Sequence, residues 1–218
     1  MEKLSHFEQA MARVDKEVSD MGTLCLDAVH QTMEAFEGQD KALARKVIEG
    51  DRNIDSLNKE IEQGTFRIML LDQPFASEFR NMGACLKMIT DLERIGDYCV
   101  DIAEEISSFP EEPYYPDTKN ILQMFACVES MVLKAVKSYN DKDVVSARSL
   151  EKDDDRVDNL FLAEKEELVN LLKSKESKYA DQTIIFMMIV KYLERIGDHA
   201  VNIGEWVDYS STGSHEVS

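Results

Sequence analysis

The sequence predicts an all-α fold of two tandem three-helix bundles, with six long antiparallel helices related by internal duplication. Three observations support this prediction. The 218 residues include only nine Gly and four Pro, fewer than a protein with many strands and turns needs. Apolar residues recur at three- and four-residue steps over long stretches, which is the helical period. A segment of the first half also recurs in the second half, which indicates a structural repeat.

The repeat is recognised by the hexapeptide Leu-Glu-Arg-Ile-Gly-Asp, which occurs at residues 92–97 and again at 193–198. A second match aligns Asp51, Ile54, Asp55 and Leu57 with Asp154, Val157, Asp158 and Leu160. Between the halves, three prolines within seven residues cannot continue a helix. We therefore expect a first repeat over residues 1–108, a proline-rich linker over 109–116, a second repeat over 117–209 and a disordered tail over 210–218.

Each repeat is expected to contain three helices. In the first repeat they cover residues 7–37, residues 41–71 and a stretch that begins near Phe75. Asp40 is placed to cap the second helix after a tight turn, and Pro74 would lie in the first turn of the third helix. The second repeat follows the same plan over residues 117–139, 143–173 and 179–209. Helices of about 30 residues are about 45 Å long, so both bundles are expected to be elongated.

The third helix of the first repeat has the most regular apolar pattern, with steps of three and four that alternate without exception. Its seam is formed by Cys85, Met88, Leu92, Ile95, Cys99, Ile102 and Ile106. Cys25 lies at a similar apolar helical position, and no two cysteines form a C-x-x-C pair. The cysteines are therefore expected to be free buried thiols instead of disulfides or zinc ligands.

The charge excludes some classes of partner. Acidic residues outnumber basic ones by 18. This field repels phosphate backbones and anionic lipid headgroups, so we expect no nucleic-acid binding and membrane association only through protein partners. A cation is the natural small ligand of such a field, although solubility alone would also explain it. The first residues lack the apolar stretch of a signal peptide, which favours the cytoplasm.

Carboxylates form the main candidate site. Glu93, Asp97 and Asp101 are spaced i, i+4, i+8 and form a ridge away from the apolar seam. Like charges at this spacing repel, and a divalent cation that bridges consecutive turns would offset the repulsion. The second repeat offers Glu194 and Asp198, but Asn202 replaces the third acid. Further acids at the same spacing are Asp51 with Asp55 and Asp154 with Asp158.

Two interpretations of these acids remain open. An acidic helix face is most often only a solvated face, but here the motif recurs with its flanking residues in both halves. The ligands are all oxygens, which favours Mg²⁺, Mn²⁺, Ca²⁺ or iron. Gly96 and Gly197 lie inside predicted helices at the same motif position, which favours the close approach of a neighbouring backbone or ion. His199 beside Asp198 is a further possible ligand.

Signals of catalysis are weak. The sequence contains no nucleophile elbow and no phosphate-cradling glycine loop. Glu194 and His199 are five residues apart, which does not fit the Glu-x-x-His spacing of ferritin-like di-iron oxidases. The sequence therefore favours a protein that binds partners and metal ions without turning over a substrate.

At this point the sequence resembles the PhoU family of phosphate-uptake regulators. The resemblance rests on the two Leu-Glu-Arg-Ile-Gly-Asp copies, on Asp91 before the first copy and on Gln73-Pro74 before the third helix. It covers roughly residues 5–209. The resemblance implies a cytoplasmic, commonly dimeric protein that links the ATPase subunit of an ABC phosphate transporter to a sensor histidine kinase and represses the phosphate-starvation response.

The resemblance also implies metal binding, because members of this family bind iron, zinc, magnesium or manganese through E/D-x-x-x-D motifs. The matching positions are Glu93, Asp97, Asp101, Glu194 and Asp198, with Asp51, Asp55, Asp154 and Asp158 as further candidates. Asn202 departs from the acidic pattern. The alternative function is metal handling. In that case the protein would be a helical bundle that stores metal ions or carries out redox chemistry at the clusters.

Overall fold

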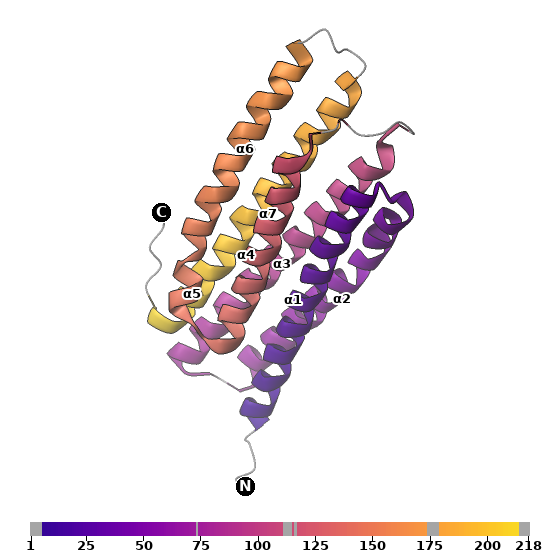
Figure 1. Cartoon of the computed structure of the whole chain (residues 1–218). Coiled ribbons are helices and arrows are strands. Elements are labelled where there is room, and N and C mark those ends of the chain that lie inside the picture. The colour runs from indigo at the N-terminus through magenta and orange to yellow at the C-terminus, as the bar shows by residue number, and fades with distance from the viewer. Residues whose placement is uncertain (1–5, 73, 111–114, 116, 174–178, 214–218) are drawn as a thin grey trace.

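In a computed structural model the chain forms an elongated bundle of helices that run along one long axis (Figure 1). The structure describes residues 6–72, 74–110, 115, 117–173 and 179–213. All regular structure in these ranges is helical, which confirms the all-α prediction. The helices are α1 (His6–Gly38), α2 (Lys41–Leu71), α3 (Ala76–Ser108), α4 (Lys119–Asp141), α5 (Val144–Arg148), α6 (Leu150–Lys173) and α7 (Ala180–Thr212).

The turn before the second helix is built in the same way in both repeats. Gln39 and Lys142 adopt left-handed backbone conformations with φ of 52° and 54°. The next residue is an aspartate that caps the following helix. Asp40 accepts from the N–H groups of Ala42 and Leu43 at 2.8 and 3.0 Å, as its sequence position predicts. Asp143 does the same at the start of α5, so the duplication extends to the turns.

One predicted helix is interrupted. Residues 143–173 were expected to form a single helix, but the structure divides them at Ser149 into α5 and α6. The N–H and hydroxyl of Ser149 both donate to Ser146 O, at 3.2 and 2.7 Å, which tightens the turn. At this point α7 also comes close, because a Cβ on Gly204 would lie 2.9 Å from Ala147 O.

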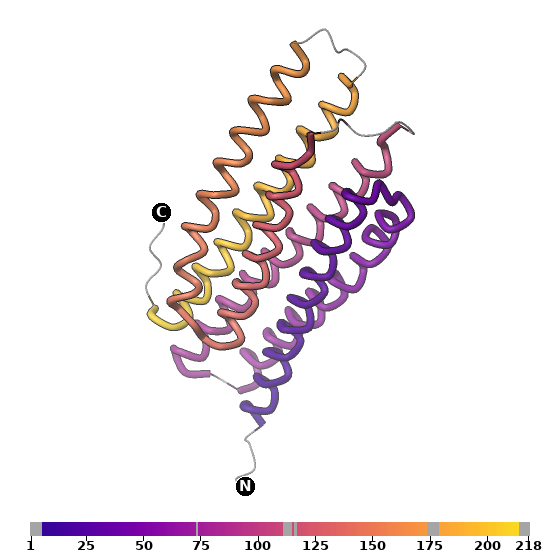
Figure 2. Tube along the Cα trace, in the orientation of Figure 1, coloured from indigo at the N-terminus to yellow at the C-terminus, as the bar shows by residue number. Residues whose placement is uncertain are grey.

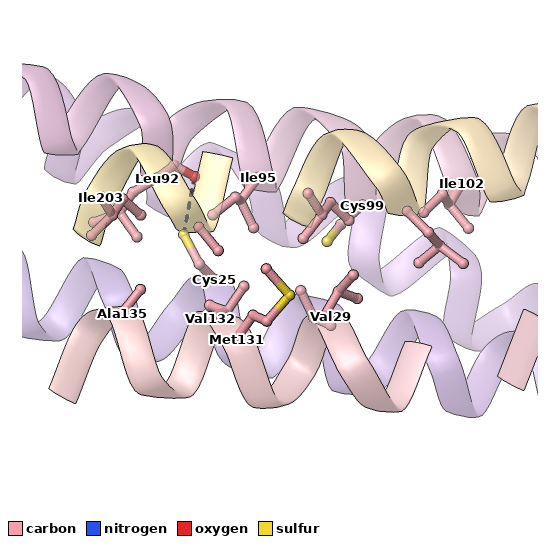
Figure 3. Packing of buried hydrophobic residues seen from close by; sticks show 14 of the residues in the cluster. Cys25, Val29, Leu92, Ile95, Cys99, Ile102, Met131, Val132, Ala135 and Ile203 are labelled. Carbon is pink, nitrogen blue, oxygen red and sulfur yellow. Dashed lines mark hydrogen bonds between the residues drawn. The ribbon is translucent and has the colours of Figure 1, made fainter. Parts of the chain in front are cut away.

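The two repeats lie side by side and share one core (Figure 2). α3 packs lengthwise against α7, and α1 packs against α4. Figure 3 shows Cys25 of α1, Leu92 of α3, Met131 of α4 and Ile203 of α7 meeting in this core, with the Cys25 thiol donating to Leu92 O at 3.2 Å. The cysteines are free, and Cys25, Cys85 and Cys99 are buried, as predicted.

The structure describes the predicted linker and the predicted tail in part. The predicted linker begins with Phe109, which is 2% exposed and packs with its ring centroid 5.2 Å from that of Phe186 of α7, the two ring planes tilted by 51°. Most of its remaining residues, 111–114 and 116, lie outside the described residues. Residues 210–212 were predicted to belong to a disordered tail, but they form the end of α7, which continues to Thr212 and ends at Gly213 with a φ of 77°. Arg80 holds this end by donating to Ser210 O at 3.4 Å. Residues 214–218 of the predicted tail lie outside the described residues.

Pro74 precedes the N-cap of α3 and so lies just before the helix instead of in its first turn. The backbone N–H of the N-cap residue Phe75 donates to the Glu78 carboxylate at 2.7 Å, and this hydrogen bond stabilises the start of α3. Within the described residues, none of the helices has the length and apolar character needed to cross a bilayer.

Candidate functional site

The acids predicted from the first repeat come together at the α2–α3 contact. Asp51 and Asp55 of α2 lie opposite Glu93 and Asp97 of α3, and we call these four residues the first carboxylate cluster. Burial, followed by the charges of Asp55, Asp97 and Glu93, raises the pKa of Asp51 to about 6. Burial and the charges of Asp97 and Asp55 also raise the pKa of Glu93. Acids that seemed secondary in the sequence therefore belong to the same cluster as the motif.

The second repeat reproduces this arrangement between α6 and α7. Its cluster, called the second carboxylate cluster, consists of Asp154, Asp158, Glu194 and Asp198. Burial, followed by the charges of Asp158, Asp198 and Glu194, raises the pKa of Asp154 to about 7. Burial and the charge of Glu194 raise the pKa of Asp198. Both clusters therefore concentrate negative charge at partly buried positions.

The glycine of each motif makes room for the aspartate of the facing helix. A Cβ on Gly96 would lie 2.9 Å from Asp51 Oδ1, and a Cβ on Gly197 would lie 2.8 Å from Asp154 Oδ1. These distances are shorter than a van der Waals contact. A helix-interior glycine costs about 1 kcal/mol relative to alanine. In both repeats the glycine allows the carboxylate of the facing aspartate to lie directly against the backbone of α3 or α7.

Cations from the same helices neutralise part of the charge. Arg94 donates to Asp97 at 3.3 Å, and Arg195 donates to Asp198 at 3.1 Å. Lys191 adds a contact of 2.6 Å to Glu194. Arg94 and Arg195 are about half exposed, so their ion pairs with the acids are weak and neutralise little of the charge of each cluster. Each cluster keeps a surplus of negative charge.

The residues fit a hard cation by donor type. All the donors are carboxylate oxygens, which Mg²⁺, Mn²⁺ and iron accept. Asp154 Oδ1 is buried without a hydrogen-bond partner, so this atom lacks the stabilisation that a buried carboxylate oxygen needs. Within the described ranges, however, no three His, Cys, Asp or Glu side chains are already arranged as a metal site. The fit to a hard cation therefore rests on donor type and on the unpartnered Asp154 Oδ1.

Asp101 lies at the edge of the first carboxylate cluster, and burial, followed by the charges of Glu104 and Asp97, raises its pKa. It corresponds to Asn202 in the repeat. Both residues lie where α3 packs against α7, and we call this contact between the two repeats the seam. Tyr192 of α7 has a pKa raised by burial and then by the charge of Asp101. Asn202 donates to Asp91 of α3 at 3.1 Å. The departure from the acidic pattern at Asn202 therefore leaves the second carboxylate cluster intact.

The seam contains a polar group that the sequence did not indicate. Asp91 is 8% exposed and accepts three hydrogen bonds from α7. The donors are His199 Nδ1 at 2.8 Å, Asn202 Nδ2 at 3.1 Å and Trp206 Nε1 at 3.1 Å. His199 is thus bound across the seam, not within the cluster of the adjacent Asp198. The i, i+3, i+7 spacing of the three donors places them on one face of α7, and this was the only feature of the sequence that could have indicated a shared partner.

Comparisons with known proteins identify the family of the two repeats. The PhoU domain model matches residues 18–106 and 121–207, one match for each repeat. A phosphate-specific transport system accessory protein PhoU homolog from Clostridium acetobutylicum is 36% identical over 208 residues, covering 95% of this chain and 94% of its own. PhoU homolog 1 from Thermotoga maritima is 33% identical over 211 residues, with 96% and 90% covered. The crystal structure of PhoU from Pseudomonas aeruginosa superposes with a TM-score of 0.91 at 29% identity, covering 96% of this chain and all of that one.

Proposed function

Because this chain belongs to the PhoU family, we propose that it is a non-enzymatic regulator of phosphate uptake on the cytoplasmic side of the membrane. In this proposal it contacts the ATPase subunit of an ABC phosphate transporter and a sensor histidine kinase, and it represses the phosphate-starvation response. The relatives are named as accessory proteins of the phosphate-specific transport system, and they match over nearly their whole length.

The observation that carries the proposal is the presence of two complete copies of the motif with the same local construction. In each copy a glycine admits the facing aspartate, and four acids gather at one helix pair. Long, straight helices also offer extended lateral faces for docking on partner proteins. The large acidic surplus makes free phosphate a poor direct ligand, so phosphate status would be sensed through protein conformation.

The same clusters are the proposed binding sites for Fe, Mn, Mg or Zn ions. The donor set favours the hard ions among these, and a bound ion would offset the mutual repulsion of the four acids. An ion that binds only the folded state raises stability by mass action, so the metal should raise the melting temperature. Asp198→Asn combined with Asp154→Asn should remove this rise for the second cluster.

Gene deletion tests the regulatory role. Deletion should raise phosphate-starvation transcripts in phosphate-rich medium, and the full-length gene should restore repression. A strain carrying Asp97→Asn and Asp198→Asn should behave as a partial deletion. Glu62→Gln, which changes an exposed acid of α2 outside the clusters, is the matched control and should behave as the parent.

Unchanged phosphate-responsive expression in the deletion strain would reject the regulatory role. Metal uptake by the purified parent, with loss in the cluster variants, would then favour the alternative of metal handling. Phosphatase or ATPase activity that persists through purification and is lost after a single substitution would reject the non-enzymatic assignment.

A further inference from the structure

A cavity of about 380 Å³ lies between the two repeats at one end of the bundle, and we call it the inter-repeat cavity. Its walls come from the start of α1, the start of α3, the end of α4 and the end of α7, which lie together at the end where α1 begins (Figure 1). Cys85, Met88 and Val207 are buried parts of the wall. Small-molecule sites usually have volumes of about 300–1,000 Å³, so the cavity is large enough for a ligand.

The equivalent space at the opposite end of the bundle is filled by phenylalanine side chains. Phe186 near the start of α7 packs against Phe36 near the end of α1, with ring centroids 6.1 Å apart. It also packs against Phe109 after α3, at 5.2 Å. All three side chains are at most 2% exposed. Because exchanging the two repeats carries one end of the bundle onto the other, this cluster is the counterpart of the inter-repeat cavity.

Smaller residues at the matching positions leave the inter-repeat cavity open. When the two repeats are aligned by the hexapeptides and by the capping aspartates, the matching pairs are Phe186 with Cys85, Phe109 with Ser210 and Phe36 with Tyr139. Cys85, Ser210 and Tyr139 all line the cavity. Two phenyl rings of the filled end are therefore missing here. Since the same fold accepts phenylalanine at these positions, the hollow is a feature of this sequence and not a requirement of the fold.

The polar groups of the inter-repeat cavity favour a cationic ligand. Asp15 and Glu78 line it, and Lys142 is the one base among its lining residues that the structure describes. The Tyr139 hydroxyl donates to Asp15 Oδ1 at 2.8 Å, which holds the carboxylate beside the ring. A carboxylate can accept about four hydrogen bonds, so Asp15 keeps the capacity to bind an ammonium group. The net charge of −18 also attracts cations.

We propose that the inter-repeat cavity binds a small organic cation, an amine with an apolar body. The ammonium group pairs with Asp15 next to the ring of Tyr139, because aromatic faces attract cations. The apolar body lies against Met88 of α3 and Val207 of α7. A ligand in this position touches both repeats and stabilises their contact, since it binds only the folded arrangement. This proposal does not depend on the regulatory role.

The test measures the binding of tryptamine to the full chain by NMR titration at about pH 7, where the amine is charged. Tryptamine carries an ammonium group on an indole body. Tryptophol is its neutral counterpart, and indole-3-propionic acid is its anionic counterpart. Tryptamine should bind with a dissociation constant in the millimolar range or below. It should bind about 10-fold or more tightly than either counterpart, because neither of them can donate a charged hydrogen bond to Asp15.

Two variants fill the inter-repeat cavity with the residues of the opposite end. Cys85→Phe and Ser210→Phe should each weaken tryptamine binding by about 10-fold or more, while circular dichroism stays helical. If one of these variants fails to fold, the other still provides the test. Leu133→Phe adds a ring at an exposed position of α4 outside the cavity. It is the matched control and should bind tryptamine as the parent does.

A further variant tests the charge of the site. Asp15→Asn should weaken tryptamine binding by about 10-fold and leave tryptophol binding unchanged, because only the amine uses the carboxylate charge. Asp20→Asn changes an exposed acid of the same helix that does not line the cavity, and it should bind both probes as the parent does.

Three outcomes would overturn the proposal. The first is that none of the three probes binds up to its solubility, since the cavity would then hold only water. The second is tryptamine binding that survives the filling variants or is lost in Leu133→Phe, because the amine would then bind elsewhere. The third is tryptamine binding that is no tighter than that of its counterparts, or that is unchanged in Asp15→Asn, because the carboxylate would then not select the ligand.

Discussion

Replacing Glu164 by isoleucine should stabilise the protein, and the gain should appear only as the pH rises. Glu164 of α6 is 2% exposed, and its Oε2 atom is buried without a hydrogen-bond partner. The equivalent residue of the first repeat is Ile61, which is fully buried, so the fold accepts isoleucine at this position. Burial raises the pKa of Glu164 to about 7, although a hydrogen bond with Asn120 acts in the opposite direction, and the charges of Glu167 and Asp117 add to the effect of burial.

The magnitude follows from the difference between the folded and unfolded pKa values. The carboxyl of the unfolded chain ionises near its ordinary pKa of 4.5, whereas the folded one stays protonated up to about 7. The parent therefore loses stability as the pH rises through this window and is constant above it. The shift corresponds to about 3 kcal/mol, and solvent screening through the exposed Asp117 and Glu167 lowers it to about 2 kcal/mol.

Urea unfolding of parent and variant, followed by circular dichroism with a chelator present, measures the effect. The advantage of Glu164→Ile should be about 2 kcal/mol larger at about pH 8 than at about pH 4.5. Glu164→Gln is the control for charge and should lose the same pH dependence. The raised pKa values of the two carboxylate clusters cancel in this comparison, because parent and variants share them. An advantage of equal size at both pH values would refute the reasoning.

Three further predictions concern the clusters and the seam. Gly197→Ala should displace Asp154, since the new methyl would lie 2.8 Å from its Oδ1, and calorimetry should show weaker metal binding than in the parent. Metal should raise the melting temperature more near pH 8 than near pH 5, because protons compete for Asp154 and Asp51, whose pKa values are raised to about 7 and about 6. Asp91→Leu should lower the free energy of unfolding by about 2–4 kcal/mol in urea titrations, since three donors of α7 would lose their acceptor.

The helices were largely predictable because their signals are local. The second helix was predicted over residues 41–71 and is found there, since Asp40 caps its start and an Asp-Gln-Pro sequence ends it. The division at Ser149 was not predictable in this way. It depends on the hydrogen bond that Ser149 donates to Ser146 O and on the close approach of Gly204 of α7 to Ala147. The spacing of apolar residues contains no information on either contact.

The candidate site was predictable within one helix and less so between helices. Spacing placed Glu93 and Asp97 on one face, and the structure brings Asp51 and Asp55 of α2 into the same cluster. Spacing also put Asp101 on the same ridge, and the charge of Asp97 does raise its pKa, but spacing gave no sign that Asp101 also lies near Tyr192 of α7. Asp91 was recognised only as part of a motif, because its partners lie more than 100 residues away.

The seam also bears on how the two halves came to differ. Asp91 and Tyr192 occupy equivalent positions of the two repeats, yet Asp91 accepts hydrogen bonds while Tyr192 lies against Tyr98 at 5.9 Å. If two separate copies of a single repeat met at this seam, both would carry the same residue at this position. Joining the repeats in one polypeptide removes that constraint, because each half then mutates alone. The covalent link therefore turns a symmetric contact into one that has a donor side and an acceptor side.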